Sequence, residues 1–168
     1  FVRIALCGYL GSGCTEVAEI LGSNFGMETF NTSAIIESIK DLKSFGVSGE
    51  IDIDIVIKNK LEEILKRDNV IIEDRSAFML LDRKDVIKIF LNASLEDRIK
   101  HVAKRRGVPI EEAREDVLRS DEDRNHLIKR FFNKDCIDAR NYDFTLNTSS
   151  KTYSRTAETI SQVIKPLS

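Results

Sequence analysis

Short apolar runs alternate with longer helical patterns along the whole chain, and this alternation constrains the fold more than any other feature. Five of the runs have the length and the branched or aromatic side chains of buried strands. They cover residues 2–7, 27–30, 70–72, 86–91 and 142–146. Strands that alternate with helices are joined by right-handed crossovers, which produce a parallel sheet covered on both faces. The sequence therefore predicts a three-layer α/β/α fold around a five-stranded parallel sheet.

Apolar residues recur every three or four positions between these runs, which is the spacing of a helix with one buried face. The predicted helices cover residues 16–21, 35–42 and 53–65 and begin again near Ser94 and Ser154, with a flexible break at residues 46–49. Neither a repeat nor a linker rich in glycine, serine or proline divides the 168 residues, so we expect residues 1–168 to form a single domain. Because residue 1 is Phe and not Met, we expect an initiator or a longer segment upstream.

The charge balance of the chain argues against nucleic acid as a partner. Its 26 basic and 28 acidic residues give a net charge of -2 and a pI near 5.8, so there is no global basic field. The apolar runs are too short to span a membrane, and the N-terminus lacks the pattern of a signal peptide. Three cysteines without Cys-x-x-Cys spacing favour a reducing compartment over a disulfide framework or structural zinc. We therefore expect a cytoplasmic protein with a small-molecule partner, in an oligomeric state that the sequence leaves open.

A charged helical region at residues 104–134 carries many arginines among acidic residues. One interpretation is a solvated pair of helices with ion pairs between neighbouring turns, which contribute little to stability. The other is a lid that brings arginines over a bound substrate, with Arg119, Arg124 and Arg130 among them. The charge pattern alone favours the first interpretation.

A glycine-rich segment follows the first predicted strand and opens the first helix, and residues 8–15 read GYLGSGCT. This spacing has the frame of a Walker A phosphate loop, in which glycines let backbone N-H groups turn toward phosphate oxygens at a helix N-terminus. The alternatives fit worse: Glu16 stands where a dinucleotide fingerprint has its third glycine, and an ordinary tight turn explains fewer residues. The predicted ATP-binding residues are Gly8, Gly11, Ser12, Gly13, Cys14 and Thr15, with the Thr15 hydroxyl on Mg2+.

Cys14 stands where the Walker A pattern has lysine. A neutral thiol supplies no cation, and a unit charge at ~4 Å is worth ~4 kcal/mol at an effective dielectric constant of ~20. This free energy corresponds to roughly a thousandfold in rate, so the loss is expected to affect phosphoryl transfer more than binding. Cys14 itself is interpreted as a small packed residue, with a reactive thiol as the alternative.

Further segments make the chain similar to nucleoside monophosphate kinases of the cytidylate kinase-like family, which are P-loop enzymes. Residues 31–34, NTSA, resemble the start of the monophosphate-binding helix, and residues 70–75, VIIEDR, resemble a strand that ends in Gly-Arg. Residues 90–98 resemble the strand and helix before the lid. Residues 121–124, DEDR, resemble the Asp-x-x-Arg motif of the lid, and residues 142–149 resemble the last strand and the loop beside the donor base. The order and spacing of these segments carry the resemblance, which implies a P-loop NTPase fold with a helical lid.

The resemblance implies a role for each matching residue. The residues implied in catalysis are Arg75, Arg119, Arg124 and Arg130, because guanidinium groups bind phosphate oxygens. Those implied in acceptor binding are Thr32, Ser33, Asp74, Arg75 and Asp121. Asp74 is either an acid for the Mg2+ water shell or a helix cap. The alternative for Arg75 is a surface ion pair with Asp74, and for Arg124 an ion pair within the lid helices.

The sequence also departs from the family pattern at phosphate-facing positions. Asn31, Ser33 and Asp74 replace Asp, Gly and Gly, and Glu37 replaces an arginine. With Cys14, two cations expected near phosphate are therefore absent, although the core pattern is intact. We predict a kinase that transfers the ATP γ-phosphoryl group to a nucleoside monophosphate, CMP by resemblance. The alternatives are a catalytically impaired nucleotide-binding sensor or interaction domain, and a scaffold that binds no nucleotide.

Overall fold

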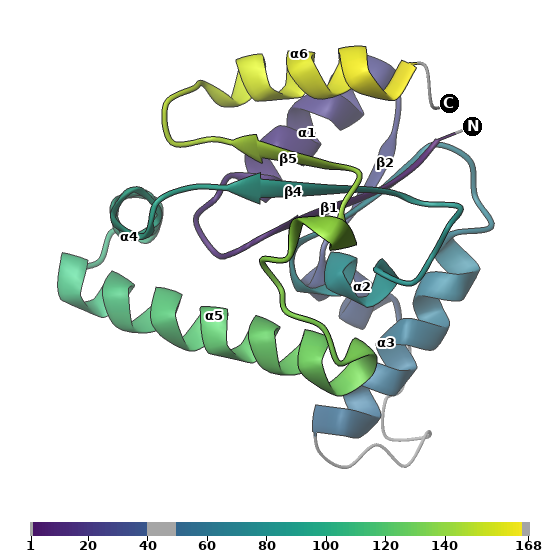
Figure 1. The fold of residues 1–168 in the computed structure, drawn as a ribbon, viewed down its shortest axis with the longest axis horizontal. Coiled ribbons are helices and arrows are strands. Elements are labelled where there is room, and N and C mark those ends of the chain that lie inside the picture. The colour runs from purple at the N-terminus through teal and green to yellow at the C-terminus, as the bar shows by residue number, and fades with distance from the viewer. Residues whose placement is uncertain (1, 40–49, 166–168) are drawn as a thin grey trace.

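The five apolar runs form one parallel sheet, shown in Figure 1 in a computed structural model that describes residues 2–39 and 50–165. The strands are β1 Arg3–Gly8, β2 Glu28–Phe30, β3 Val70–Glu73, β4 Ile87–Asn92 and β5 Phe144–Asn147. Their order across the sheet is β2-β3-β1-β4-β5, and every neighbouring pair is parallel. The predicted five-stranded parallel sheet is confirmed, with β1 at its centre.

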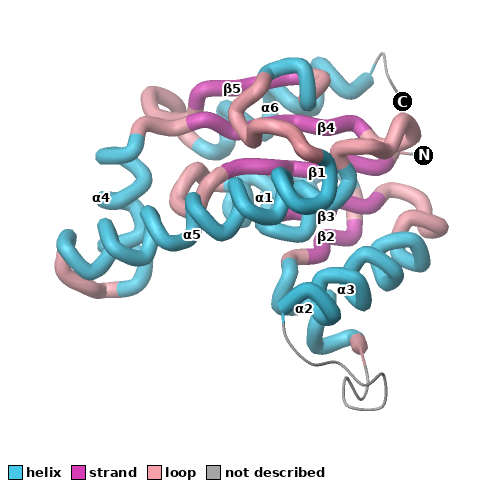
Figure 2. The backbone as a smooth tube through the Cα atoms, turned by 60° about the horizontal axis from the view of Figure 1, so that its bottom comes forward, coloured by secondary structure: helices cyan, strands magenta, loops and turns pink. Residues whose placement is uncertain are grey.

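Helices connect the strands and cover both faces of the sheet (Figure 2). They are α1 Cys14–Phe25, α2 Thr32–Ser38, α3 Glu50–Ile64, α4 Leu95–Arg106, α5 Ile110–Phe132 and α6 Tyr153–Ile164, with short 3-10 helices η2 Asp74–Leu80 and η3 Ala139–Asn141. Figure 1 shows α1 and α6 above the sheet and α3 and α5 below it, as the predicted three layers require. The helices of the two described ranges are all too short or too polar to cross a membrane.

Alternation along the central strand divides the core into two layers. Ile4 and Leu6 on β1 belong to the buried cluster that includes α1 and α6. Ala5 and Cys7 point to the other face and belong to the cluster that includes α3, η2 and α5. Because side chains alternate along a strand, a run that is apolar at every position must be buried on both faces. Because β1 pairs in parallel with β3 and β4, the carboxyl ends of the three strands lie at one edge of the sheet.

The last strand begins later than predicted, because Tyr142 belongs to the turn before it. Its backbone N-H donates to the carbonyl of Ala139, and its ring stacks on Phe90 with 4.9 Å between the ring centroids. The strand therefore starts at Phe144. Aromatic residues are common in strands, which is why the sequence placed Tyr142 in one. Its ring instead packs against the neighbouring strand from the preceding turn.

Helix boundaries follow local capping signals. Ser94 caps α4 as expected, since its Oγ accepts the N-H of Asp97 at 3.2 Å. Thr152 caps α6 through the N-H of Arg155, also at 3.2 Å. The helix predicted over residues 35–42 instead ends at Ser38 in the described part, and its last predicted turn and the flexible break at residues 46–49 lie outside the described residues.

The region predicted as a charged helix pair or a lid, residues 104–134, contains the end of α4, a turn at Gly107 and the whole of α5. Gly107 ends α4 in a left-handed conformation with φ of 65°. Ala113 and Val117, near the start of α5, pack against α4 in a small apolar cluster of their own. Leu127 near its end belongs to the main core. The first half of α5 thus stands apart from the core, and its closing over a substrate stays a prediction.

Candidate active site

The glycine-rich segment forms a tight loop between β1 and α1, at the carboxyl edge of the sheet. Gly11 and Gly13 have left-handed backbones, with φ of 88° and 97°, which glycine adopts without steric cost. A Cβ atom on Gly11 would lie 2.6 Å from the carbonyl oxygen of Arg98, and one on Gly13 would lie 2.4 Å from the ring of Tyr153. The loop is therefore enclosed between α4 and α6, and both positions require glycine.

The loop presents the uncapped N-terminus of α1 to the site. Gly13 stands at the cap position and offers no side-chain hydrogen bond to the first turn. Ser12 is fixed on both sides, because its N-H donates to the carbonyl of Tyr9 at 3.1 Å and its own carbonyl accepts the Thr148 hydroxyl at 2.8 Å. Free N-H groups and the partial positive charge of a helix N-terminus together favour a phosphate ligand.

Cys14 begins α1 and is 8% exposed. Its Sγ lies 3.6 Å from the Oγ of Ser12, and it belongs to the same buried cluster as Val17. Burial raises the pKa of this thiol well above its usual value, so the side chain is neutral. The interpretation as a packed residue is confirmed, and the lysine position of the loop carries no charge.

The three cysteines, Cys7, Cys14 and Cys136, are all buried free thiols, and burial raises the pKa of each. Since the thiolate is the nucleophile, we expect the folded protein to resist iodoacetamide at about pH 8 under conditions that alkylate free glutathione completely. After denaturation in guanidinium all three should react, as counted by intact mass. Rapid alkylation of Cys14 in the folded protein would contradict its burial.

A carboxylate meets the loop at Thr15. The Thr15 Oγ1 donates to the two carboxylate oxygens of Glu73 at 3.1 and 3.2 Å, because Glu73 ends β3 directly beside β1. Burial, assisted by the neighbouring charge of Asp74, raises the pKa of Glu73 to about 7. Hydroxyl and carboxylate oxygens are suitable donors for Mg2+, which usually takes its remaining ligands from water and phosphate. The described residues contain no group of three or more His, Cys, Asp or Glu that could hold a metal alone.

The sequence analysis offered Asp74 either as an acid for the Mg2+ water shell or as a helix cap, and it missed Glu73. Asp74 has a left-handed backbone with φ of 72°, and its side chain pairs with Arg124 of α5 instead of reaching Thr15. Asp74 also caps no helix, because the cap residue of η2 is Glu73 and makes no side-chain cap bond. A carboxylate at the end of a buried strand next to the loop strand was the signal that points to Glu73.

Two arginines of α4 and α5 are buried, and one of them contacts the loop. Arg98 and Arg124 are each 6% exposed, and the Nε of each is buried without a hydrogen-bond partner in the described residues. Arg98 donates to both carboxylate oxygens of Asp121 at 2.9 Å and to the loop carbonyl of Leu10 at 3.3 Å. Arg124 bonds Asp74 and the hydroxyl of Ser120. Arg98 was absent from the predicted site, whereas Asp121 and Arg124 were included.

A second charged cluster lies where α3, η2 and α5 meet. Arg75 donates to Asp54 at 2.6 and 3.2 Å and to Asp123 at 2.6 Å, and Arg130 also bonds Asp54. Asp54 is 1% exposed. The alternative of a surface ion pair between Arg75 and Asp74 is wrong, because Arg75 pairs across helices instead. Asp54 was not predicted, although its spacing from the apolar residues of α3 placed a carboxylate on the core face.

The predicted arginine Arg119 lies at the rim of the site. Its side chain is 75% exposed and 3.7 Å from Asp116, one turn earlier in α5. A cavity of about 830 Å3 runs along α5 and is lined by Arg119 together with Tyr9, Asp123 and Arg130. The exposed arginine thus shares a cavity with the charged cluster and with Tyr9 of the phosphate loop.

The start of α2 supplies hydroxyl groups but no cation. Thr32 is fixed by Ser76, since their hydroxyls lie 2.9 Å apart and the Ser76 N-H donates to Thr32 Oγ1 at 3.1 Å. Ser33 and Glu37 are exposed on the same helix. The helix carries no basic residue over its bounds, so the arginine that the family pattern has here is not replaced within α2.

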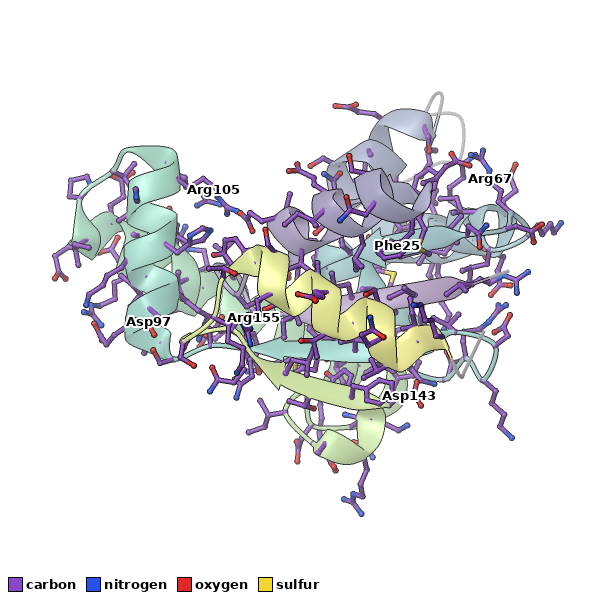
Figure 3. All side chains as sticks on the ribbon, turned by 90° about the horizontal axis from the view of Figure 1, so that it is seen from above. Phe25, Arg67, Asp97, Arg105, Asp143 and Arg155 are labelled. Carbon is purple, nitrogen blue, oxygen red and sulfur yellow. The ribbon has the colours of Figure 1, made fainter. Side chains whose placement is uncertain are left out.

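The opposite flank of the loop carries a polar cluster built from three helices. Glu16 of α1 accepts a hydrogen bond from Arg105 of α4 at 3.0 Å, and Figure 3 shows Arg105 extending from α4 toward α1. His101 lies 3.1 Å from Glu16 and 3.1 Å from the hydroxyl of Tyr153. This cluster holds α4 and α6 against the first turn of α1, which fixes the walls of the loop.

Comparison with known proteins finds relatives over the whole chain. Residues 50–150 match the cytidylate kinase-like family. The chain is 30% identical to a protein named cytidylate kinase from Methanopyrus kandleri, over 99% of this chain and 94% of that one. It is 25% identical to a cytidylate kinase from Ignicoccus hospitalis, over 96% of this chain and 98% of the other.

Solved structures share the fold. An uncharacterized protein from Eubacterium ventriosum superimposes with a TM-score of 0.79 at 22% identity, over 98% of both chains. A shikimate kinase from Acinetobacter baumannii superimposes with a TM-score of 0.65 at 17% identity, over 99% of this chain and 94% of that one. Because the sequence matches are nearly full length and agree with the phosphate-loop geometry, the chain belongs to the cytidylate kinase-like family.

Proposed function

We propose that this chain is a nucleotide kinase that transfers the γ-phosphoryl group of ATP to CMP. The observation that carries the proposal is the meeting of the glycine loop, the Thr15–Glu73 pair and buried arginines at one edge of the sheet. Phosphoryl transfer needs mainly cations and N-H groups that position two substrates and stabilise charge. CMP as the acceptor is supported by the names of the relatives, which are cytidylate kinases.

The donor nucleotide is assigned to the glycine loop. Backbone N-H groups from Gly11 to Thr15 bind its phosphate oxygens at the N-terminus of α1. Thr15 Oγ1 and the Glu73 carboxylate hold Mg2+, directly or through its water ligands. When bound, Mg2+ neutralises charge on the β- and γ-phosphate oxygens. Asp121 supports this side indirectly, because it fixes Arg98 against the loop.

The acceptor monophosphate is assigned to the cluster at Arg75 and Arg130, with Thr32 and Ser33 at its edge. An oxygen of the acceptor phosphate attacks the γ-phosphorus, and the bond from that phosphorus to the bridging oxygen of ATP breaks. The electron pair of this bond leaves with ADP. The attacking oxygen is already anionic, so the reaction requires no general base.

The first half of α5 is assigned the role of a lid. It carries Arg119 at the rim and leads into Arg124, and its small cluster with α4 is separate from the main core. Closing of residues 104–134 over both substrates excludes water and brings Arg119 toward the transferring group. The exposure of Arg119 in this structure fits an open arrangement.

The proposal is tested with a panel of acceptors. ADP formation from ATP and Mg2+ is followed in a coupled assay with AMP, CMP, GMP, UMP and dCMP. We expect the kcat/KM of CMP to exceed that of the other ribonucleotides by about tenfold or more. The variant Thr15→Val, which keeps the shape but removes the hydroxyl, serves as the negative control. Equal rates with every acceptor would refute CMP specificity, and no ADP with any acceptor would refute the kinase.

A second function, nucleotide binding without turnover, is favoured by one observation, the neutral buried thiol at the lysine position. Calorimetry with ATP and ADP separates the two functions. A measurable Kd together with a flat acceptor panel supports a binding or sensor domain. Absence of any nucleotide binding eliminates both.

A further inference from the structure

Tyr9 lies in the glycine loop at a position that the phosphate-binding pattern leaves open. The Walker A frame specifies Gly8, Gly13 and the two residues that follow, but not the residue after the first glycine. Tyr9 supports the loop from within, because its carbonyl accepts the N-H of Ser12 at 3.1 Å. Its side chain extends away from the loop to α5, where the hydroxyl donates to Asn125 Oδ1 at 2.6 Å. The loop and the helix are therefore joined directly.

The ring of Tyr9 is restrained as well as its hydroxyl. It meets the ring of Phe90 on β4 edge to face, with 6.0 Å between the centroids and 86° between the planes. The guanidinium carbon of Arg98 lies 5.2 Å from the centroid of the Tyr9 ring, and a cation over an aromatic ring is attracted to it. Burial raises the pKa of the phenol, so the hydroxyl keeps the proton that it donates. Contacts from β4, α4 and α5 thus hold this one side chain.

Arg98 joins the same loop to the same helix a second time. It donates to the carbonyl of Leu10, the residue after Tyr9, at 3.3 Å and to both carboxylate oxygens of Asp121 at 2.9 Å. Asp121 and Asn125 are four residues apart on α5, so the two contacts come from one face of the helix. Two adjacent loop residues are therefore held by one turn of α5.

The same part of α5 carries the charged cluster to which we assign the acceptor phosphate. Asp123 accepts a hydrogen bond from Arg75 at 2.6 Å, and Arg130 follows on the same helix. The cavity of about 830 Å3 is lined by Tyr9 from the loop and by Asp123, Asn125 and Arg130 from α5. The contact between Tyr9 and Asn125 therefore lies beside the space between the two proposed substrate sites.

We propose that Tyr9 is a positioning residue, which acts through Asn125 to set the distance between the phosphate loop and the acceptor cluster on α5. Phosphoryl transfer requires the attacking oxygen and the γ-phosphorus to be close and in line, and a displacement of about 1 Å can cost about a hundredfold in rate. The Tyr9 hydroxyl transfers no proton in this role. The inference rests on the proposed function for its rate measurements but not for its hydrogen-exchange measurement.

The test is a cycle of Tyr9→Phe, Asn125→Ala and the double variant. Each single variant should lower kcat with CMP by about tenfold, which is the upper value of one hydrogen bond. The KM for CMP and the Kd for ATP should each change by less than about twofold, because the groups that bind the substrates are kept. The double variant should be no slower than either single variant, since the two residues make one contact.

Three results of this cycle would overturn the inference. The first is the parent kcat in Tyr9→Phe. The second is a loss of about a hundredfold in the double variant, which would mean that the two residues act independently. The third is a loss that appears as weaker ATP binding, which would give Tyr9 a role in binding the donor and not in positioning. Tyr9→Phe keeps the aromatic ring and its packing, and thermal unfolding checks that the variant is folded.

Tyr142→Phe is the matched control for Tyr9→Phe. Tyr142 also packs its ring against Phe90, but its hydroxyl donates to the carbonyl of Cys136 at 2.6 Å, outside both the loop and α5. This variant should unfold at a lower temperature and keep kcat within about twofold of the parent. A tenfold loss of kcat here as well would show that the effect is not specific to Tyr9.

Hydrogen exchange separates this inference from the proposed function, because it needs ATP but no acceptor. In the parent, ATP should slow amide exchange in residues 8–13 and, through the Tyr9–Asn125 contact, in residues 121–128 by about threefold or more. In Tyr9→Phe the loop should still be protected, whereas residues 121–128 should not. If the parent transfers phosphoryl to no acceptor, the kinase proposal fails and this comparison still decides the inference. Equal protection of α5 in the two proteins would overturn it, and absence of ATP binding would overturn both.

Discussion

Replacement of Gly11 by alanine is expected to abolish ATP binding and to lower the free energy of unfolding by about 3 kcal/mol. The left-handed backbone, with φ of 88°, costs an alanine about 1 to 2 kcal/mol. The added Cβ would lie 2.6 Å from a carbonyl oxygen of α4, a backbone atom that cannot rotate away. The loop must then move away from α4, which misplaces the N-H groups to which we assign the ATP phosphates. Calorimetry with ATP and urea unfolding measure the two effects.

The matched control is Gly26→Ala, because Gly26 ends α1 with φ of 63° and its Cβ would meet nothing within 4 Å. This variant carries the backbone cost without the collision. We expect a loss of about 1 kcal/mol in stability and unchanged ATP affinity. Equal losses of stability in the two variants would refute the steric argument for Gly11.

Replacement of Arg75 by alanine is expected to lower kcat/KM for CMP by about a hundredfold or more, which corresponds to ~3 kcal/mol of transition-state stabilisation. The affinity for ATP should change little, because we assign Arg75 to the acceptor side. Stability should fall by about 3 kcal/mol as well, since buried Asp54 loses one of its two arginine partners. Steady-state kinetics with CMP, calorimetry with ATP and thermal unfolding distinguish these effects.

Arg67→Ala is the control for Arg75. Arg67 is an exposed arginine stacked on Phe30 and paired at 3.0 Å with Glu28, which begins β2 at the amino edge of the sheet, opposite the edge that carries the phosphate loop. Its loss should cost at most about 1 kcal/mol and leave the kinetics unchanged. If Arg75→Ala kept the parent kinetics with CMP, the acceptor site would have to lie elsewhere.

The architecture was predictable because its signals are local. The central strand is apolar at every position from Ile4 to Cys7, and burial on both faces of a parallel sheet explains such a run. The glycine loop was equally predictable from the sequence. Gly11 and Gly13 have left-handed backbones that favour glycine, so the spacing of the glycines reflects the shape of the loop. The ends of strands and helices were harder to predict from the sequence. Tyr142, for example, was predicted to begin the last strand, but its backbone belongs to the turn before that strand.

The charged side chains of the site were harder to predict, because their partners are distant in sequence. Arg98 and Asp121 lie on different helices, and nothing near either residue specifies the other. Asp54 and Glu73 could have been predicted as site residues, because each is an acid on an otherwise apolar face. Asp74 was included in the predicted site because it is the acid beside Arg75. The alternation of side chains along the strand, however, turns Glu73 and not Asp74 toward the loop.

Arg75 also connects α3 and α5, the two helices beside the acceptor site that we propose. Its guanidinium holds a carboxylate of α3 on one side and a carboxylate of α5 on the other. An acceptor phosphate that takes this guanidinium competes with both carboxylates at once. At the acceptor site that we propose, binding is therefore an exchange of anions at Arg75, while Arg130 of α5 keeps its own bond to Asp54 of α3.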